Sequence, residues 1–134
     1  MYAGVEVKFM RIIIPGEPVA KGRPKFTKRG FTYTPAKTEA AEKYIRAFVS
    51  GYPSFAPGLP LAMSIDFYLT KPKSVGKKRE FPTTRPDIDN YIKLVFDSLN
   101  GVLFDDDSQI ISLLASKKYG DPARIELEIN EVLI

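Results

Sequence analysis

The sequence predicts a single α+β domain with a small mixed β-sheet of about four strands and two main helices. Four segments show the β-branched or alternating apolar pattern of strands, at residues 11–14, 61–69, 109–115 and 124–133. Two longer segments, residues 35–50 and 87–99, repeat apolar side chains at helical spacing. The chain has 134 residues, 44% hydrophobic and 27% charged, which is typical of one globular domain with a modest core.

The first predicted strand, residues 11–14, is a short β-branched run that a Pro-Gly pair ends. Met10 offers an alternative start of the chain. We therefore expect residues 1–10 to be an N-terminal extension and residues 11–134 to form the domain.

A basic segment and a helix follow this strand. Residues 21–34 contain two glycines and a proline, and they are expected to form a basic loop or an irregular hairpin. The next helix opens at Thr34–Pro35, with the proline at its first position, and extends to about Ser50. Its predicted apolar stripe consists of Ala40, Ala41, Tyr44, Ile45 and Phe48.

The middle of the chain is predicted to be a strand between two loops. Residues 51–60 contain three prolines and two glycines and form a connection. In residues 61–69, apolar side chains at odd positions from Met63 alternate with Ser64, Asp66 and Tyr68. Residues 70–84 are rich in lysine, and we expect a mobile loop that a ligand orders.

Residues 87–99 carry the strongest helix pattern. Asp87 can cap the first turn, and the Asn-Gly pair at 100–101 is a stop signal. The predicted apolar face consists of Ile88, Ile92, Val95 and Leu99. Two strands, residues 109–115 and 124–133, follow, with a turn between them. In the last strand the apolar residues alternate with glutamates, which predicts one buried face and one solvent-exposed face.

The absence of two residue types restricts the possible chemistry. The chain has no cysteine and no histidine. This excludes disulfides, thiolate zinc sites, cysteine nucleophiles and the serine–histidine triad. Any metal must be held by oxygen atoms, which favours Mg²⁺, Mn²⁺ or Ca²⁺.

Charge is distributed unevenly along the chain, whose formal net charge is +4. Residues 18–38 contain six basic and no acidic residues, and residues 71–85 contain six basic residues against one glutamate. Residues 87–107 contain six aspartates against one lysine. Basic segments suit a polyphosphate, and an acidic centre suits the cation that would act on it.

Helix geometry limits how the aspartates can cooperate. Residues i and i+2 of a helix point about 200° apart, so Asp87 and Asp89 can share a metal only if Asp87 is extended at or before the N-cap. Each acid also has a plain structural interpretation: Asp87 as a cap, Asp89 as the partner of Lys93, and Asp105 to Asp107 as a turn. An EF-hand is excluded because Ile92 stands where the loop needs glycine.

Several motifs together resemble a known family. They are R-P-D-I-D-N-Y-I-K at 85–93, D-S-L-N-G at 97–101, D-D-S-Q-I at 106–110, P-G-E-P at 15–18, K-G-R-P-K at 21–25, Y-T-P at 33–35, and Lys117 with Tyr119. From about residue 11 onward, the chain is similar to the RusA-type Holliday junction resolvases, a family of crossover junction endodeoxyribonucleases. Asp105 departs from the family pattern, and so does Lys25, where the family often has arginine.

The resemblance implies a homodimeric, Mg²⁺-dependent endodeoxyribonuclease that resolves Holliday junctions by paired nicking in DNA recombination and repair. Mn²⁺ is a plausible substitute, no small-molecule cofactor is expected, and the family is frequent in prophages. By position, Asp87, Asp89 and Asp107 match the metal-binding and catalytic carboxylates. Lys93 matches the catalytic lysine, and Asp106 is an additional candidate ligand.

The expected partners are branched DNA, in particular four-way junctions, and a second copy of the chain in a C2 dimer. The expected DNA-binding residues are Lys21, Arg23, Lys25, Lys28, Arg29, Lys77, Lys78, Arg79, Arg85 and Lys117. Phe26, Phe31 and Tyr33 could stack on an open junction centre, or they could be core or dimer contacts. Alternative functions are a nuclease for flaps and forks, and a DNA-binding module without catalysis.

The sequence also suggests where the protein works. It has no apolar run near 20 residues, which predicts no membrane contact, and residues 1–8 lack the pattern of a signal peptide. We therefore expect a cytoplasmic protein.

Overall fold

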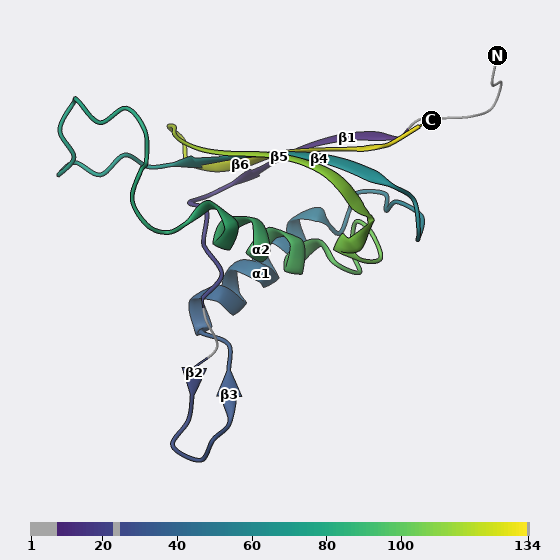
Figure 1. Cartoon of the computed structure of the whole chain (residues 1–134), viewed down its shortest axis with the longest axis horizontal. Helices are drawn as coiled ribbons and strands as arrows, with labels where there is room; N and C mark the ends of the chain where they lie inside the picture. Colours follow the sequence, from purple (N-terminus) through teal and green to yellow (C-terminus); the bar gives the residue numbers. More distant parts are fainter. Residues whose placement is uncertain (1–7, 23–24, 134) are drawn as a thin grey trace.

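The structure of the chain, a computed structural model, describes residues 8–22 and 25–133. It confirms the predicted α+β class, with a four-stranded mixed sheet and two helices (Figure 1). The elements in chain order are β1 (Phe9–Pro15), β2 (Lys25–Phe26), β3 (Thr32–Tyr33), α1 (Ala36–Val49), β4 (Leu61–Leu69), α2 (Ile88–Leu99), the 3₁₀ helix η1 (Asp107–Gln109), β5 (Ile110–Tyr119) and β6 (Arg124–Glu131).

The sheet has the strand order β1-β6-β4-β5. Strand β6 is antiparallel to both β1 and β4, whereas β5 is parallel to β4. Strands β1, β4 and β5 therefore run in the same direction, and their last residues, Pro15, Leu69 and Tyr119, lie at one end of the sheet. We call this the carboxyl end of the sheet and the opposite end the amino end. Both basic segments leave from the carboxyl end, since one follows β1 and the other follows β4.

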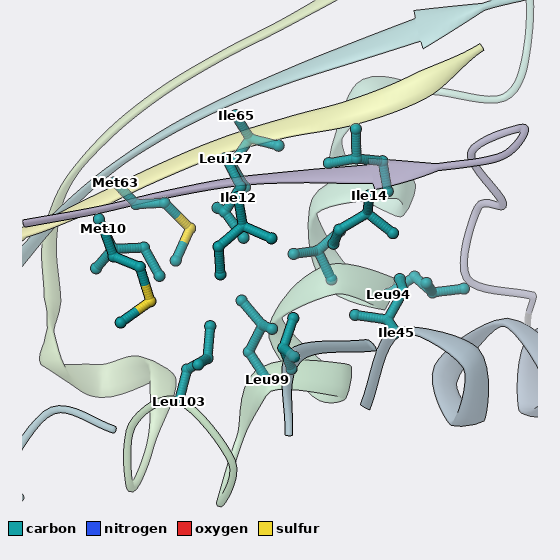
Figure 2. Close-up of a cluster of buried hydrophobic side chains, with 14 of the residues drawn as sticks. Met10, Ile12, Ile14, Ile45, Met63, Ile65, Leu94, Leu99, Leu103 and Leu127 are labelled. Carbon is teal, nitrogen blue, oxygen red and sulfur yellow. The ribbon is translucent and has the colours of Figure 1, made fainter. Parts of the chain in front are cut away.

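The core lies between the sheet and the two helices, which cover the same face (Figure 1). Alternation along each strand directs apolar side chains inward, as Ile12 on β1, Ile65 on β4 and Leu127 on β6 show. These side chains meet Ile45 of α1 and Leu94 of α2 in the close-up of the core (Figure 2). Burying each such aliphatic side chain contributes roughly 1.5–3 kcal/mol of transfer free energy.

The buried faces of the two helices differ from the predicted stripes. In α2, Tyr91, Leu94 and Ser98 are buried with Val95 and Leu99, whereas Ile88 and Ile92 are only partly buried. The Ser98 hydroxyl donates to the Leu94 carbonyl at 2.6 Å, so its burial leaves no unpaired polar group. A polar residue can therefore lie in the middle of the apolar face.

Helix α1 shows the same kind of difference. Its buried residues are Thr38, Ile45 and Val49, whereas Ala40 and Tyr44 of the predicted stripe are exposed. The Tyr44 hydroxyl instead donates to the carbonyl of Pro15 at 2.7 Å. Pro35 is the N-cap and not the first helical residue, because its ψ of 140° is extended.

All four main strands are predicted, but several of their boundaries differ from the prediction. Strand β1 begins at Phe9 instead of residue 11, and Met10 is buried within it. Strand β5 continues to Tyr119, beyond the predicted end at residue 115, because it pairs with β4 along its whole length. Strand β6 ends at Glu131. Within the basic stretch of residues 21–34, the short strands β2 and β3 pair as a hairpin over residues 25–33, one of the two forms expected for it.

On the uncovered face of the sheet, β6 presents polar side chains, as predicted for the last strand. Glu126 of β6 lies 2.8 Å from Arg11 of β1 and 2.9 Å from Arg124. Among the residues described, neither helix is long and apolar enough to cross a membrane.

Candidate functional site

The first turn of α2 presents two carboxylates. Asp87 is the N-cap residue and is extended, with φ −71° and ψ 149°, which is the conformation that helix geometry requires if Asp87 and Asp89 are to share a ligand. The Asp87 side chain makes no capping hydrogen bond, and Asp89 lies in the first turn. Both side chains are exposed. The helix dipole stabilises negative charge at this end of the helix. Among the described residues, no side-chain hydrogen bond or ion pair gives either carboxylate a structural role.

This turn lies at the carboxyl end of the sheet, where both basic segments begin. A cavity of about 570 Å³ opens beside Asp87. Its walls come from Lys21 and Gly22 of the first basic segment, Arg85 and Pro86 at the end of the second, and the N-cap Asp87 and Asn90 of α2. The acidic pair is therefore placed between two basic segments that are far apart in sequence.

Two contacts anchor the first basic segment near its base, one to Thr70 just before the second basic segment and one to α2. The Glu17 carboxylate accepts hydrogen bonds from the Thr70 hydroxyl at 2.7 Å and from the Thr70 amide at 3.1 Å. The Lys21 amide donates to the Asn90 carbonyl at 2.9 Å. The sequence analysis did not identify the first of these contacts, because its partners are 53 residues apart.

Lys117 supports the turn before Asp87. Its ammonium group donates to the carbonyls of Thr84 and Pro86, each at 2.9 Å. Because Pro86 immediately precedes Asp87, this lysine on β5 fixes the position of the N-cap. Lys117 was predicted to contact DNA, and in this structure its hydrogen bonds are made within the protein.

Lys21 is likewise engaged within the protein. Its ammonium group lies 2.6 Å from the Glu42 carboxylate and 3.1 Å from that of Asp97. Burial lowers the pKa of Lys21, but the hydrogen bonds and attraction from Glu42 and Asp97 are together stronger, so its pKa is raised overall. Lys93 reaches the same Asp97 carboxylate at 3.9 Å, and its side chain is 65% exposed.

The carboxylates at residues 105–107 lie at the opposite end of the sheet, before the first residue of β5. Asp106 caps η1 and accepts a hydrogen bond from the Ser108 amide at 3.0 Å. Hydrogen bonds from Ser108 are the main cause of the lowered pKa of Asp106. Gln109 is buried, and its side-chain oxygen accepts hydrogen bonds from the backbone amides of Asp105 and Asp106. Local structure thus explains much of the D-D-S-Q motif.

Asp107 accepts a hydrogen bond from the Asn100 side chain at 3.1 Å. Asn100 is the C-cap of α2, and Asp87 is its N-cap. At about 1.5 Å per residue, the 12-residue helix separates its two ends by roughly 18 Å. One chain therefore does not bring Asp107 together with Asp87 and Asp89.

The described residues also contain no group of three acidic side chains that could hold a metal ion. The pair Asp87 and Asp89 has the oxygen donors that Mg²⁺ and Mn²⁺ prefer, but a three-carboxylate site is incomplete within residues 8–22 and 25–133 of a single chain. At the other end of α2, the side-chain oxygen of Asn100 is buried without a hydrogen-bond partner among the described residues.

The remaining predicted DNA-binding residues lie on the two projecting segments. Lys28 and Arg29 are exposed at the tip of the β2–β3 hairpin. Lys77, Lys78, Arg79 and Arg85 are exposed in and after the loop between β4 and α2. None of these six forms an ion pair with a carboxylate that the structure describes. Arg23 and the side chain of Lys25 lie outside the described part of the chain.

Comparison with known proteins identifies relatives of this chain. Residues 15–130 match the family described as Endodeoxyribonuclease RusA. An uncharacterized protein of Bacillus subtilis, YqaN, is 37% identical over 137 aligned residues, which cover 92% of this chain and 96% of the relative. The crossover junction endodeoxyribonuclease rusA of Lactococcus phage r1t is 38% identical over 81 residues, which cover 58% of this chain and 60% of the relative.

Proposed function

This chain belongs to the RusA endodeoxyribonuclease family, and from that premise we propose that it resolves Holliday junctions by paired nicking of DNA. One structural observation carries the proposal. An exposed pair of carboxylates, Asp87 and Asp89, lies beside a cavity between two basic segments that suit a polyphosphate backbone. The Lactococcus phage relative, whose name states a crossover junction activity, supports a four-way junction as the substrate.

In this proposal, Asp87 and Asp89 hold the catalytic ion. Bound Mg²⁺ would lower the pKa of a water molecule and neutralise charge on the scissile phosphate, and Mn²⁺ is the expected substitute. Lys93 lies one helical turn after Asp89 with an exposed side chain, which suits it to position that phosphate. Lys117 positions Asp87 through the Pro86 carbonyl.

The third carboxylate requires a second copy of the chain, and the β5 strand is suited to provide it. Strand β5 is at one edge of the sheet, with β4 as its only neighbour among the described strands. Its apolar residues Ile111 and Leu114 are 63% and 74% exposed. An unpaired strand edge with exposed apolar side chains favours pairing with another chain.

Antiparallel pairing of two β5 strands about an axis near Leu113 is also favourable electrostatically. Acidic residues precede each strand and lysines 117 and 118 lie near its end, so opposite charges would face each other across the two-fold axis. The partner subunit's Asp107 would then lie beside Lys117, which contacts the turn of Asp87. We propose that each site of a C2 homodimer combines Asp87 and Asp89 of one chain with the partner's Asp107.

The proposed function is tested by titrating Mg²⁺ into the protein with a four-way junction, a flap, a fork and a linear duplex. We expect Mg²⁺-dependent paired nicking of the junction and much slower cleavage of the other DNAs. Equal cleavage of flaps and forks would indicate a nuclease for branched DNA in general. Binding without cleavage at any Mg²⁺ concentration would indicate a DNA-binding module and would contradict the proposal.

A further inference from the structure

The β2–β3 hairpin is a projecting element with two exposed phenylalanines. It extends away from the helices and the sheet (Figure 1). Phe26 is 75% exposed and Phe31 is 68% exposed. Exposing two aromatic rings to water is unfavourable, and neither ring belongs to the described core. The structure therefore excludes the core role that the sequence left open for these two residues.

Hydrogen bonds in the turn define the shape of the hairpin. The Thr27 amide donates to the Phe31 carbonyl at 2.7 Å, and the Phe31 amide donates to the Thr27 hydroxyl at 3.1 Å. Gly30 has a φ of +84°, which a residue with a side chain adopts with difficulty. The two rings are therefore presented by a short, closed turn, which lowers the entropy lost when they bind a partner.

The charge around the rings indicates the kind of partner. Lys28 and Arg29 lie between Phe26 and Phe31, and residues 18–38 contain no acidic side chain. Exposed cations beside exposed aromatic faces match a ligand that combines phosphates with flat apolar surfaces. Unstacked nucleotides have this combination, whereas a second copy of this basic hairpin would be repelled.

The position of the hairpin relative to the carboxylates supports this partner. Lys21 and Gly22, at the base of the hairpin, line the cavity with Asp87. The Gly22 amide donates to the Thr38 hydroxyl at 3.0 Å, and an added Cβ at Gly22 would meet that hydroxyl oxygen at 3.0 Å. The base of the hairpin is thus held closely against α1, and DNA bound at Asp87 would lie next to the hairpin.

We propose that Phe26 and Phe31 stack on or insert between bases at the branch point of the DNA, and so make binding selective for junctions over duplex. This inference rests on the proposed function, because it takes branched DNA as the substrate. In a duplex the bases are already stacked on both sides and offer the rings no open face, whereas bases at an opened branch point lack a stacked neighbour on one side.

The test places 2-aminopurine at the branch point of a four-way junction, because its fluorescence rises when the base is unstacked from its neighbours. The Asp89→Asn chain prevents cleavage during the measurement. We expect a fluorescence change on binding, and the Phe26→Ala/Phe31→Ala variant should lose it. That variant should bind the junction about tenfold or more weakly, with duplex binding changed less than about twofold.

Two matched variants control for the loss of an exposed ring elsewhere and for substitution at the two hairpin positions themselves. Phe9→Ala removes an exposed phenylalanine from β1, and it should leave the signal unchanged. Phe26→Tyr/Phe31→Tyr keeps both rings and should retain the signal. An unchanged signal in the double alanine variant would overturn the inference, and so would an equal loss of junction and duplex binding. A change from dimer to monomer by sedimentation would also overturn it, because the rings would then be subunit contacts.

This inference can fail while the proposed function stands. If the wild-type protein cuts junctions and the double alanine variant gives the full 2-aminopurine signal, only the role of the hairpin is contradicted. If the wild-type protein does not bind branched DNA in preference to duplex, the proposed function fails together with the inference.

Discussion

The two ends of helix α2 carry similar acidic motifs but use them differently. At the N-terminal end, Asp87 and Asp89 are exposed, and Asp87 makes no capping hydrogen bond. At the C-terminal end, Asp106 caps η1 and Asp107 accepts a hydrogen bond from Asn100. Among the residues that the structure describes, the aspartates at the first end have no local structural partner, whereas Asp106 and Asp107 at the second end help to form the turn that starts β5.

This difference indicates how function can be assigned within one acidic cluster. A carboxylate that the fold uses for capping should affect stability when it is changed, and one that the fold does not use should affect activity. Asp107 is the exception, because we propose that it serves both the turn in its own chain and the site of the partner chain.

The largest expected effect concerns the N-terminal end of α2. Asp89→Asn should reduce junction cleavage by roughly 100-fold or more, with junction binding and melting temperature nearly unchanged, because the side chain is exposed. Single-turnover cleavage and thermal melts measure both quantities. Glu128→Gln, on the uncovered face of the sheet, is the matched control and should cut normally. Full cleavage by Asp89→Asn would contradict the assignment.

The next effect concerns the edge of the sheet that we propose to join the two chains. Leu114→Asp would place a charge on each side of the axis near Leu113, and the dimer should dissociate. Cleavage should then fall by about tenfold or more, as the sites lose the partner's Asp107. Ile13→Asp on β1, at the other edge of the sheet, should leave the dimer intact. Sedimentation velocity distinguishes these outcomes, and an intact Leu114→Asp dimer would rule out the β5 interface.

A substitution in the turn after the C-terminal end of α2 should change the stability of the fold. Gln109 is buried, accepts from two amides and donates to the carbonyls of Ala56 and Leu59. Gln109→Ala leaves these backbone groups unpaired and should lower the free energy of unfolding by about 2–4 kcal/mol. Urea denaturation measures the change. A loss below about 0.5 kcal/mol would show that this turn is not structurally important.

The smallest effect is a pH dependence at the same end. The pKa of Asp106 is lowered by its hydrogen bonds from Ser108, so its ionised form stabilises the fold above the unfolded-state pKa near 3.8. This contribution is lost as the pH falls through the lower folded-state pKa. The difference in melting temperature between the wild type and Asp106→Asn should therefore shrink with falling pH below about pH 4. A difference in melting temperature that stays constant across that pH range would contradict this role of Asp106.

Much of the fold could be predicted from local patterns. The range of β4, the end of α2 and the extended conformation of Asp87 follow from alternation, from the Asn-Gly stop and from helix geometry. The burial of Ser98 was not predicted, and it is possible because a hydrogen bond within the helix removes the cost of burying the hydroxyl. That bond depends on how α2 packs, and the spacing of apolar residues does not report it.

The candidate site could be predicted only in part. The family motifs identify Asp87, Asp89 and Asp107, and the predicted helix over residues 87–99 lies between them, but the sequence does not indicate that the chain fails to bring Asp107 back to the first turn of that helix. The tether from Lys117 to Pro86 joins residues 31 positions apart and could not be found from spacing. The sequence does contain one indication of the proposed interface. Apolar residues of β5, including Ile111, Leu113 and Leu114, do not alternate regularly with polar residues, and these three are exposed in the structure.

The most direct test of this account mixes two inactive chains, Asp87→Asn and Asp107→Asn, by co-expression with different tags. If each site takes Asp87 from one chain and Asp107 from its partner, the mixed dimer has one site with both substitutions and one intact site. We therefore predict that the purified mixed dimer nicks the junction in one strand, while each variant alone is inactive. A mixed dimer without any nicking would contradict a site shared between the chains.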